Sequence, residues 1–114
     1  MSFPVFLLPQ AVGFLDSLNV RFRAKSVRTI ELLKLFGPNL AMPHSKKIQG
    51  KDNLYELRVQ LATDICRFFY FQHKESIYVV TSGFVKKTQK TDPNEIERAI
   101  RIREEFVARQ KELK

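Results

Sequence analysis

The sequence lacks most of the residues and motifs that common enzyme classes use. Its single cysteine, Cys66, excludes an internal disulfide and a metal site built from several cysteines. Its two histidines, His44 and His73, stand without a serine–histidine–acid set, a metal-ligand spacing, a glycine-rich phosphate loop or a cofactor motif. We therefore expect neither a metal nor a cofactor. We interpret Cys66 as a small buried residue of a strand rather than a reactive thiol.

Long apolar runs are also missing. The apolar stretch from Phe3 to Leu8 is too short for a membrane span and lacks the basic lead of a signal peptide. The composition is ordinary for a folded protein, with 44% hydrophobic and 28% charged residues, and no internal repeat is visible. We expect a cytoplasmic protein without membrane contact, folded as one domain over residues 1–114.

Acidic residues are scarce, and the formal net charge is +8. Residues 21–51 contain eight lysines and arginines but one acid, Glu31, whereas residues 52–85 contain three basic and four acidic residues. Residues 86–114 contain nine basic and six acidic residues. This uneven distribution favours binding to nucleic acid or to an acidic protein, with a merely solvated basic surface as the alternative.

The segment from Leu54 to Thr91 predicts an antiparallel sheet. Three runs rich in aromatic and β-branched residues are separated by breaks at 62–64 and 72–75, which are too short for parallel crossovers. The run 55–61 alternates apolar and polar residues, as expected of a strand with one buried face, and 65–71 is apolar on both faces apart from one arginine, as expected of a central strand.

Two arginines interrupt these strands, Arg58 in the first and Arg67 in the second. Because arginine is rarely buried without a partner, each should line a site or meet a carboxylate such as that of Glu56. The two lie on one face only if the loop between their strands has an even number of residues, or if a bulge intervenes. We expect them to share a face.

Helical spacing appears in three places. Apolar positions predict a helix from about Gln10 to Leu18 and a second from about Val20 to Phe36, which Gly37-Pro38 should end. The sequence Asp92-Pro93-Asn94-Glu95 is typical of the start of a third helix. The expected inner side of the second helix consists of Ala24, Val27, Ile30, Leu33 and their neighbours, and that of the third consists of Ile96, Ala99, Ile100, Phe106 and Val107.

The remaining segments complete the expected order. Phe3 to Leu8 predicts a short edge strand limited by two prolines, and Asn39 to Asn53 predicts a loop. With the helices and strands above, this order indicates the α+β class, with two N-terminal helices packed on a small, mostly antiparallel sheet and a C-terminal helix.

Cations are the most abundant reactive groups, and cleavage of RNA is a reaction that cations assist. When a 2′-hydroxyl attacks the adjacent phosphorus, the transition state gains negative charge that fixed lysines and arginines stabilise. A lysine crowded by other cations could serve as general base, and His44 could act as acid or base near neutral pH.

Several motifs resemble one known family over about residue 14 to the end. They are Phe14–Leu18, Ile30–Leu33, Phe36-Gly37, Pro43–Lys47, Leu54–Arg58, Arg67–Phe71 and Gly83–Thr91. They are similar to the phage-derived Gp49-like (HigB-like) branch of the RelE/ParE/HigB toxin superfamily. The resemblance implies a type II toxin, a ribosome-dependent endoribonuclease that cuts mRNA. It also implies a helix-turn-helix antitoxin (HigA-like) encoded by the adjacent gene.

The same resemblance implies the site residues. Those at the expected catalytic positions are Arg58, Arg67, Lys86 and Lys87, and those expected to contact RNA are His44, Lys46, Lys47 and Lys90. Four of them have a structural alternative: Arg67 bound to Glu56, Lys86 and Lys87 as plain solvent-facing lysines, and His44 as a residue that only shapes its loop. The phenylalanines in 68–71 suit a core better than a base-stacking platform, and Tyr70 alone among the aromatics there carries a polar group.

Two other functions remain open from the sequence. One is a ParE-like inhibitor that binds a topoisomerase without cleaving RNA, and the other is a non-enzymatic basic module that binds nucleic acid. The adjacent reading frame and the mapping of mRNA 5′ ends discriminate between these interpretations.

Overall fold

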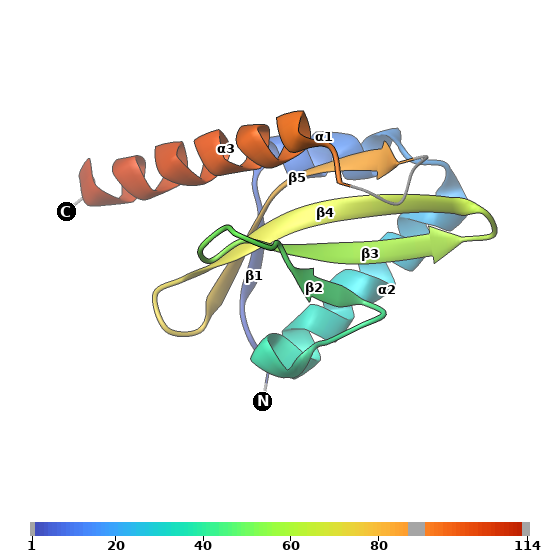
Figure 1. The fold of residues 1–114 in the computed structure, drawn as a ribbon. Helices are drawn as coiled ribbons and strands as arrows, with labels where there is room; N and C mark the ends of the chain where they lie inside the picture. The colour runs from blue at the N-terminus through green and yellow to red at the C-terminus, as the bar shows by residue number, and fades with distance from the viewer. Residues whose placement is uncertain (1, 87–90, 113–114) are drawn as a thin grey trace.

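The computed structural model describes residues 2–86 and 91–112, which form a five-stranded sheet with helices on both faces (Figure 1). The elements are β1 (Val5–Leu7), α1 (Pro9–Ser17), α2 (Val20–Phe36), the 3-10 turn η1 (Gly37–Asn39), β2 (Ser45–Lys47), β3 (Tyr55–Leu61), β4 (Asp64–His73), β5 (Ile77–Lys86) and α3 (Pro93–Glu112). The α+β class, the helix order and the sheet expected from the sequence are confirmed.

The strands lie in the order β1-β5-β4-β3-β2, and all neighbours are antiparallel except β1 and β5. The short edge strand near the N-terminus is therefore present, paired in parallel with β5 through Val5 and Tyr78. The expectation of a plain loop over 39–53 is wrong, because Ser45–Lys47 pairs with β3 as β2. Of the residues in the expected breaks 62–64 and 72–75, Asp64, Gln72 and His73 belong to β4 rather than to turns.

The helix α2 has the bounds that the sequence predicts. Asn19 accepts a hydrogen bond from the Phe22 backbone N–H at 2.9 Å, which caps the N-terminus, and Gly37 ends the helix with a positive φ of 51°. A methyl group on Gly37 would also lie within 2.6 Å of the Phe3 ring. The Gly37 position therefore requires glycine for its conformation and for the contact with Phe3.

The buried side of α2 differs from the expected one. Ala24 and Val27 are exposed, whereas Ile30 and Leu33 are buried as expected. The other buried residues of α2 are Phe22, Ser26 and Thr29. Burial of the two hydroxyls is possible because both have partners: Ser26 Oγ lies 3.6 Å from Cys66 Sγ, and Thr29 Oγ1 donates to the Lys25 carbonyl at 3.0 Å.

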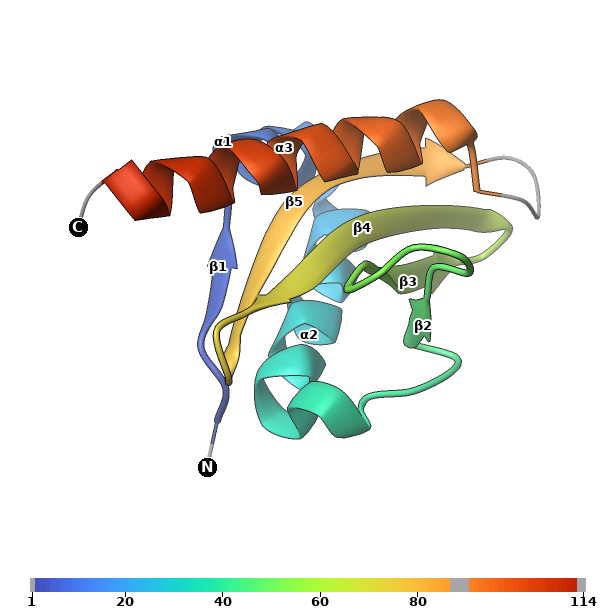
Figure 2. The ribbon, with the colours of Figure 1, turned by 60° about the vertical axis from the view of Figure 1, so that its left-hand side comes forward.

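The helices α1 and α2 cover one face of the sheet, and α3 crosses the other (Figure 2). Under α1, the Phe14 ring packs edge-on against Phe68 at 5.3 Å and lies directly on Gly83, where an added Cβ would be 2.4 Å from the ring. The absence of a side chain at Gly83 lets α1 approach the middle of the sheet.

The helix α3 begins where the sequence predicts, because the Asp92 side chain accepts a hydrogen bond from the Asn94 N–H at 2.9 Å. Its buried residues are Ala99 and Ile102, so Ile102 joins the expected stripe, while Phe106 and Val107 are half-buried. Phe106 packs its ring edge-on against His73 at 5.1 Å.

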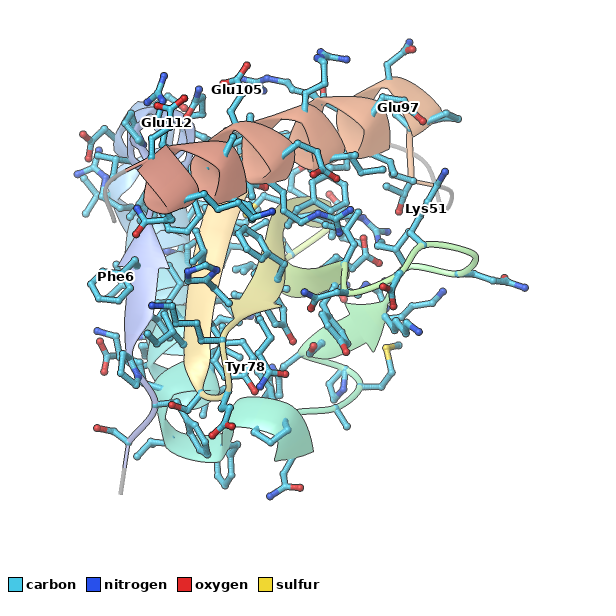
Figure 3. The ribbon with its side chains drawn as sticks, turned by 90° about the vertical axis from the view of Figure 1, so that its left-hand side faces the viewer. Phe6, Lys51, Tyr78, Glu97, Glu105 and Glu112 are labelled. Atoms are coloured by element: carbon cyan, nitrogen blue, oxygen red, sulfur yellow. The ribbon has the colours of Figure 1, made fainter. Side chains whose placement is uncertain are left out.

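Side chains of α3 also hold the loop between β2 and β3. Arg103 Nη1 donates to the carbonyls of Asp52 and Asn53 at 2.8 and 3.0 Å, and Lys51 Nζ lies 4.0 Å from Glu97 Oε1 (Figure 3). No helix within the described residues is long and apolar enough to cross a membrane.

Candidate basic site on the sheet

Arg58 and Arg67 lie on the same face of the sheet, as expected. They are direct partners in the register of β3 and β4, and direct partners in an antiparallel pair share a face. The strands are joined by Ala62 and Thr63 alone, a loop of even length in which Ala62 adopts a positive φ of 56°. This face is the one covered in part by α3, because it also carries Phe69.

Arg67 does not open freely onto that face, because it is bound to a carboxylate. Arg67 Nη1 donates to Glu56 Oε1 at 2.7 Å, and the side chains of the two residues are only 3% and 2% exposed. The other carboxylate oxygen, Glu56 Oε2, accepts a hydrogen bond from Thr91 Oγ1 at 3.1 Å. The structural alternative of Arg67 bound to Glu56 is therefore what the structure contains, and Glu56 compensates the charge of Arg67.

A cleft of about 320 Å³ lies over this ion pair. Its lining includes Arg67, Glu56 and Thr91 at the base and Lys46 and Lys47 of β2 at the rim. Both lysines are exposed, and Lys46 is the direct cross-strand partner of Glu56. The cleft therefore joins two solvent-facing cations with a guanidinium that the fold holds in one position. We name it the Arg67 cleft.

A second cleft, of about 440 Å³, lies beside Arg58, and we name it the Arg58 cleft. Among the described residues its lining is Lys25, Thr29, Pro43, His44, Arg58, Val59, Gln60, Ala62 and Ile65, which include no aspartate or glutamate. It forms where β3 extends beyond its pairing with the short strand β2.

The guanidinium of Arg58 has weak contacts only among the described residues. Its Nη1 lies 3.9 Å from Met42 Sδ, its buried Nε has no hydrogen-bond partner, and it makes no ion pair. Its backbone N–H donates to the His44 carbonyl at 2.9 Å, so His44 lies beside it. Lys25 Nζ donates to the Gln60 carbonyl in the same cleft. An uncompensated guanidinium in a cleft without acids is suited to bind an anion.

Of the remaining expected site residues, Lys86 is the last residue of β5. Lys86 is the register partner of Ile65, two residues beyond the pair of Arg67 with Phe84. Lys87 and Lys90 fall outside the residues that the structure describes. The structure therefore brings Arg58, Arg67, Lys46, Lys47 and His44 to neighbouring clefts, and it places the backbone of Lys86 at the same end of β4.

Sequence reasoning did not include two contributors to these clefts. Lys25 is not among the residues of the second helix for which the sequence predicts a contact, and nothing in its local pattern indicates the hydrogen bond to Gln60. Thr91 is the last residue of the motif Gly83–Thr91, but its hydrogen bond to Glu56 joins residues 35 positions apart. Such pairings depend on the tertiary fold and leave no local signal.

Two buried titratable groups lie on the opposite side of the sheet. Burial raises the pKa of the Cys66 thiol to about 11, as expected for a small core residue. Burial also raises the pKa of Tyr70 to about 12, and Tyr70 Oη shares a hydrogen bond of 2.5 Å with Ser45 Oγ. The hydroxyl of Tyr70 is therefore hydrogen-bonded inside the core, and neither Cys66 nor Tyr70 is a base near neutral pH. Among the described residues, no cluster of histidine, cysteine and acidic side chains could hold a metal ion.

Comparisons with known proteins agree with this architecture. A family model described as phage-derived protein Gp49-like matches residues 13–104. No curated protein matches the sequence.

Solved structures of RelE proteins are similar in fold. The free form of a double mutant of the Escherichia coli toxin RelE has a TM-score of 0.65 and 16% identity, covering 89% of this chain and 97% of RelE. RelE of the RelE–RelB complex from Pyrococcus horikoshii has a TM-score of 0.54 and 17% identity, over 79% of this chain and 100% of that one. A chain of the intact E. coli RelBE toxin–antitoxin complex has a TM-score of 0.57 and 17% identity, covering 77% of this chain and 99% of that one.

Proposed function

The chain belongs to the family of phage-derived Gp49-like proteins and has the fold of RelE, and from this premise we propose that it is the toxin of a type II toxin–antitoxin pair. Its activity is cleavage of mRNA on the ribosome, which arrests translation in the cytoplasm. Its partner is a helix-turn-helix antitoxin (HigA-like) from the adjacent gene. The RelE structures solved with an antitoxin support a partner of this kind.

The observation that carries the proposal is the direct pairing of Arg58 with Arg67 on one face of the sheet, next to the exposed lysines of β2. A strand pair fixes the spacing of its side chains more rigidly than a loop does. Cations held in fixed positions stabilise the charge that develops in a transition state without first reorganising. The Arg58 and Arg67 clefts provide such positions for adjacent phosphates of one RNA strand.

The proposed reaction is attack by the ribose 2′-hydroxyl on the neighbouring phosphorus. The new O–P bond forms as the bond to the 5′-oxygen breaks; the 2′-hydroxyl loses its proton and the departing 5′-oxygen gains one, which leaves a cyclic phosphate on one fragment and a 5′-hydroxyl on the other. Arg58, Arg67, Lys86 and Lys87 stabilise the added negative charge on the phosphate oxygens. His44, Lys46, Lys47 and Lys90 hold the RNA backbone.

We assign the two arginines different roles, because only the charge of Arg67 is compensated by an acid among the described residues. Arg67 is compensated by Glu56, so it orients hydrogen-bond donors but adds little net attraction for RNA. Arg58 has no acidic partner among the described residues, so its whole charge is available to a phosphate. Arg58 is therefore the better residue for a test of catalysis, because its loss does not leave a buried carboxylate without a partner.

The test is single-turnover cleavage of mRNA on saturating ribosomes, with 5′ ends mapped by sequencing. Arg58→Ala should lower the rate of the chemical step by roughly a hundredfold or more. The double variant Lys46→Ala/Lys47→Ala should weaken binding in a salt-dependent way and leave that step nearly unchanged. Arg101→Ala, which removes an exposed arginine from the outer side of α3, is the matched control and should behave as wild type.

Three outcomes contradict the proposal in different ways. Equal chemical rates for wild type and Arg58→Ala remove the catalytic assignment of Arg58. RNA binding without new 5′ ends favours a non-enzymatic basic module. Growth arrest with intact mRNA and inhibited DNA supercoiling favours an inhibitor of a topoisomerase.

A further inference from the structure

The helix α2 has apolar side chains on two opposite sides. Its inner side packs Phe22, Ile30 and Leu33 into the core against the sheet. Its outer side presents Val20 and Leu35, which are 74% and 59% exposed. A surface helix normally has one apolar stripe and a polar opposite face, so a second apolar stripe indicates a second covering element.

The outer apolar residues form one line along the helix. At 100° per residue, the positions 20, 24, 27 and 35 fall within about 80° of one another around the axis. They are Val20, Ala24, Val27 and Leu35, and we name them the outer stripe; all four are exposed. Position 31 interrupts the line with Glu31, whose carboxylate is bound to Lys34 Nζ at 3.1 Å. The spacing of four and three residues between positions 20, 24 and 27 suits contact with another helix.

Cations border the outer stripe on both sides. Arg21 and Arg28 are exposed on one flank and make no ion pair among the described residues. On the other flank, Arg23 donates to the carbonyls of Leu15, Asp16 and Leu18 at 3.3, 3.1 and 2.9 Å. These neutral acceptors fix the guanidinium of Arg23 without compensating its charge. The outer stripe is therefore an apolar line with Arg21 and Arg28 on one flank and the guanidinium of Arg23, held by backbone carbonyls, on the other.

The apolar outer stripe and its flanking arginines together indicate the chemistry of the partner. A second copy of the chain would bring the same flanking arginines together, and these like charges would repel each other in a protein whose net charge is already +8. A nucleic acid would satisfy the arginines but would leave Val20, Val27 and Leu35 against a polar backbone. An amphipathic helix with acidic flanks matches both the apolar line and its borders.

We propose that the outer stripe of α2 binds an amphipathic, acid-flanked helix of the cognate antitoxin. The inference rests on the proposed toxin function and adds the surface and the partner's chemistry. The stripe extends over α2 (Val20–Phe36), about 25 Å at 1.5 Å per residue, which accommodates about four turns of a partner helix. It lies on the opposite face of the sheet from α3 (Figure 2), so binding here does not require the antitoxin to occupy the Arg67 cleft.

The experiment measures affinity between the intact chain and the product of the adjacent gene by titration calorimetry. Val20→Ser/Val27→Ser should weaken binding by roughly tenfold or more, because it removes apolar contact and nothing from either cleft. Arg21→Glu/Arg28→Glu should slow association most strongly at low salt. The matched control is Phe6→Ser on edge strand β1, where the exposed ring points away from the body of the protein (Figure 3). Its affinity should stay within about twofold of wild type.

The results test the proposed binding surface and the proposed toxin function separately. Affinity of Val20→Ser/Val27→Ser within about twofold of wild type overturns the proposal, since the outer stripe is then no interface. Sedimentation that shows a wild-type dimer lost in the same variant overturns it in favour of a second copy. Ribosome-dependent cleavage without binding to the adjacent product rejects the surface but leaves the nuclease. Absence of both cleavage and growth arrest rejects the proposed function itself, irrespective of binding.

Discussion

Removal of the Glu56 charge should destabilise the protein strongly. Glu56 and Arg67 are both almost fully buried, and the distance of 2.7 Å between Arg67 Nη1 and Glu56 Oε1 leaves no room for water between them. Glu56→Ala leaves a buried guanidinium without its counter-charge, a change that typically costs about 3–5 kcal/mol. It also removes the acceptor of the Thr91 hydroxyl, which adds about 1 kcal/mol.

Substitution of the partner residue, Arg67, and the double variant distinguish an energetically coupled pair from two independent residues. Arg67→Ala should cost a similar 3–5 kcal/mol, because the Glu56 carboxylate then stays buried alone. Glu56→Ala/Arg67→Ala removes both charges together, so its cost should be well below the sum of the costs of the two single variants. The cycle should give a coupling free energy of at least about 2 kcal/mol.

The assay is urea unfolding at 25 °C, followed by circular dichroism, with the free energy of unfolding taken from linear extrapolation. A domain of this kind has about 5–15 kcal/mol of stability, so Glu56→Gln, which keeps the shape of the side chain, provides a folded variant if Glu56→Ala does not fold. Losses below about 1 kcal/mol in both single variants, or additive costs in the cycle, would refute the argument that the pair acts as one buried unit.

The remaining predictions concern the core. Leu33→Ala should lower the free energy of unfolding by about 2–5 kcal/mol in urea melts, because Leu33 is fully buried, whereas the exposed Leu35→Ala should stay within about 0.5 kcal/mol. Gly83→Ala should cost about 1–3 kcal/mol, because its methyl overlaps the Phe14 ring; equal melting temperatures would contradict that contact. Burial raises the pKa of Tyr70 from 10.0 to about 12, so stability should fall as the pH rises through that interval. Tyr70→Phe should flatten the decline in melts at graded alkaline pH.

Elements with a clear signal at their ends were predictable from the sequence. The bounds of α2 follow from the cap at Asn19 and the stop at Gly37, and α3 begins after Asp92 for the same reason. The three long strands follow from runs of aromatic and β-branched residues, although β5 extends to Lys86, beyond its apolar part. These signals are local, so neighbours in sequence suffice to recognise them.

Features that depend on distant partners were not predictable. The strand β2 consists of Ser45–Lys47, which has no apolar alternation and exists because β3 offers it an edge. The inner side of α2 was misassigned because apolar character favoured Ala24 and Val27, whereas Ser26 and Thr29 are buried with partners that sequence spacing does not reveal.

The candidate site also combines a feature with a local sequence signal and features that depend on distant partners. The shared face of Arg58 and Arg67 follows from strand alternation and from the two-residue loop 62–63, whereas the three-residue break 62–64 read from the sequence would need a bulge to give the same result. The state of each arginine depends on the fold. Glu56 lies diagonally across from Arg67 and compensates it, while Arg58 faces a cleft without acids.

The position of Arg67 affects how a loss of activity at this residue must be interpreted. Arg67 lines a basic cleft, yet it also compensates a buried carboxylate, so its removal perturbs both the fold and the proposed chemistry. An inactive Arg67→Ala protein therefore identifies a catalytic residue only if its stability and its ribosome affinity are unchanged. Arg58 has no such second role among the described residues. The contrast between the two opposed arginines thus separates transition-state stabilisation from preservation of the sheet that holds the site.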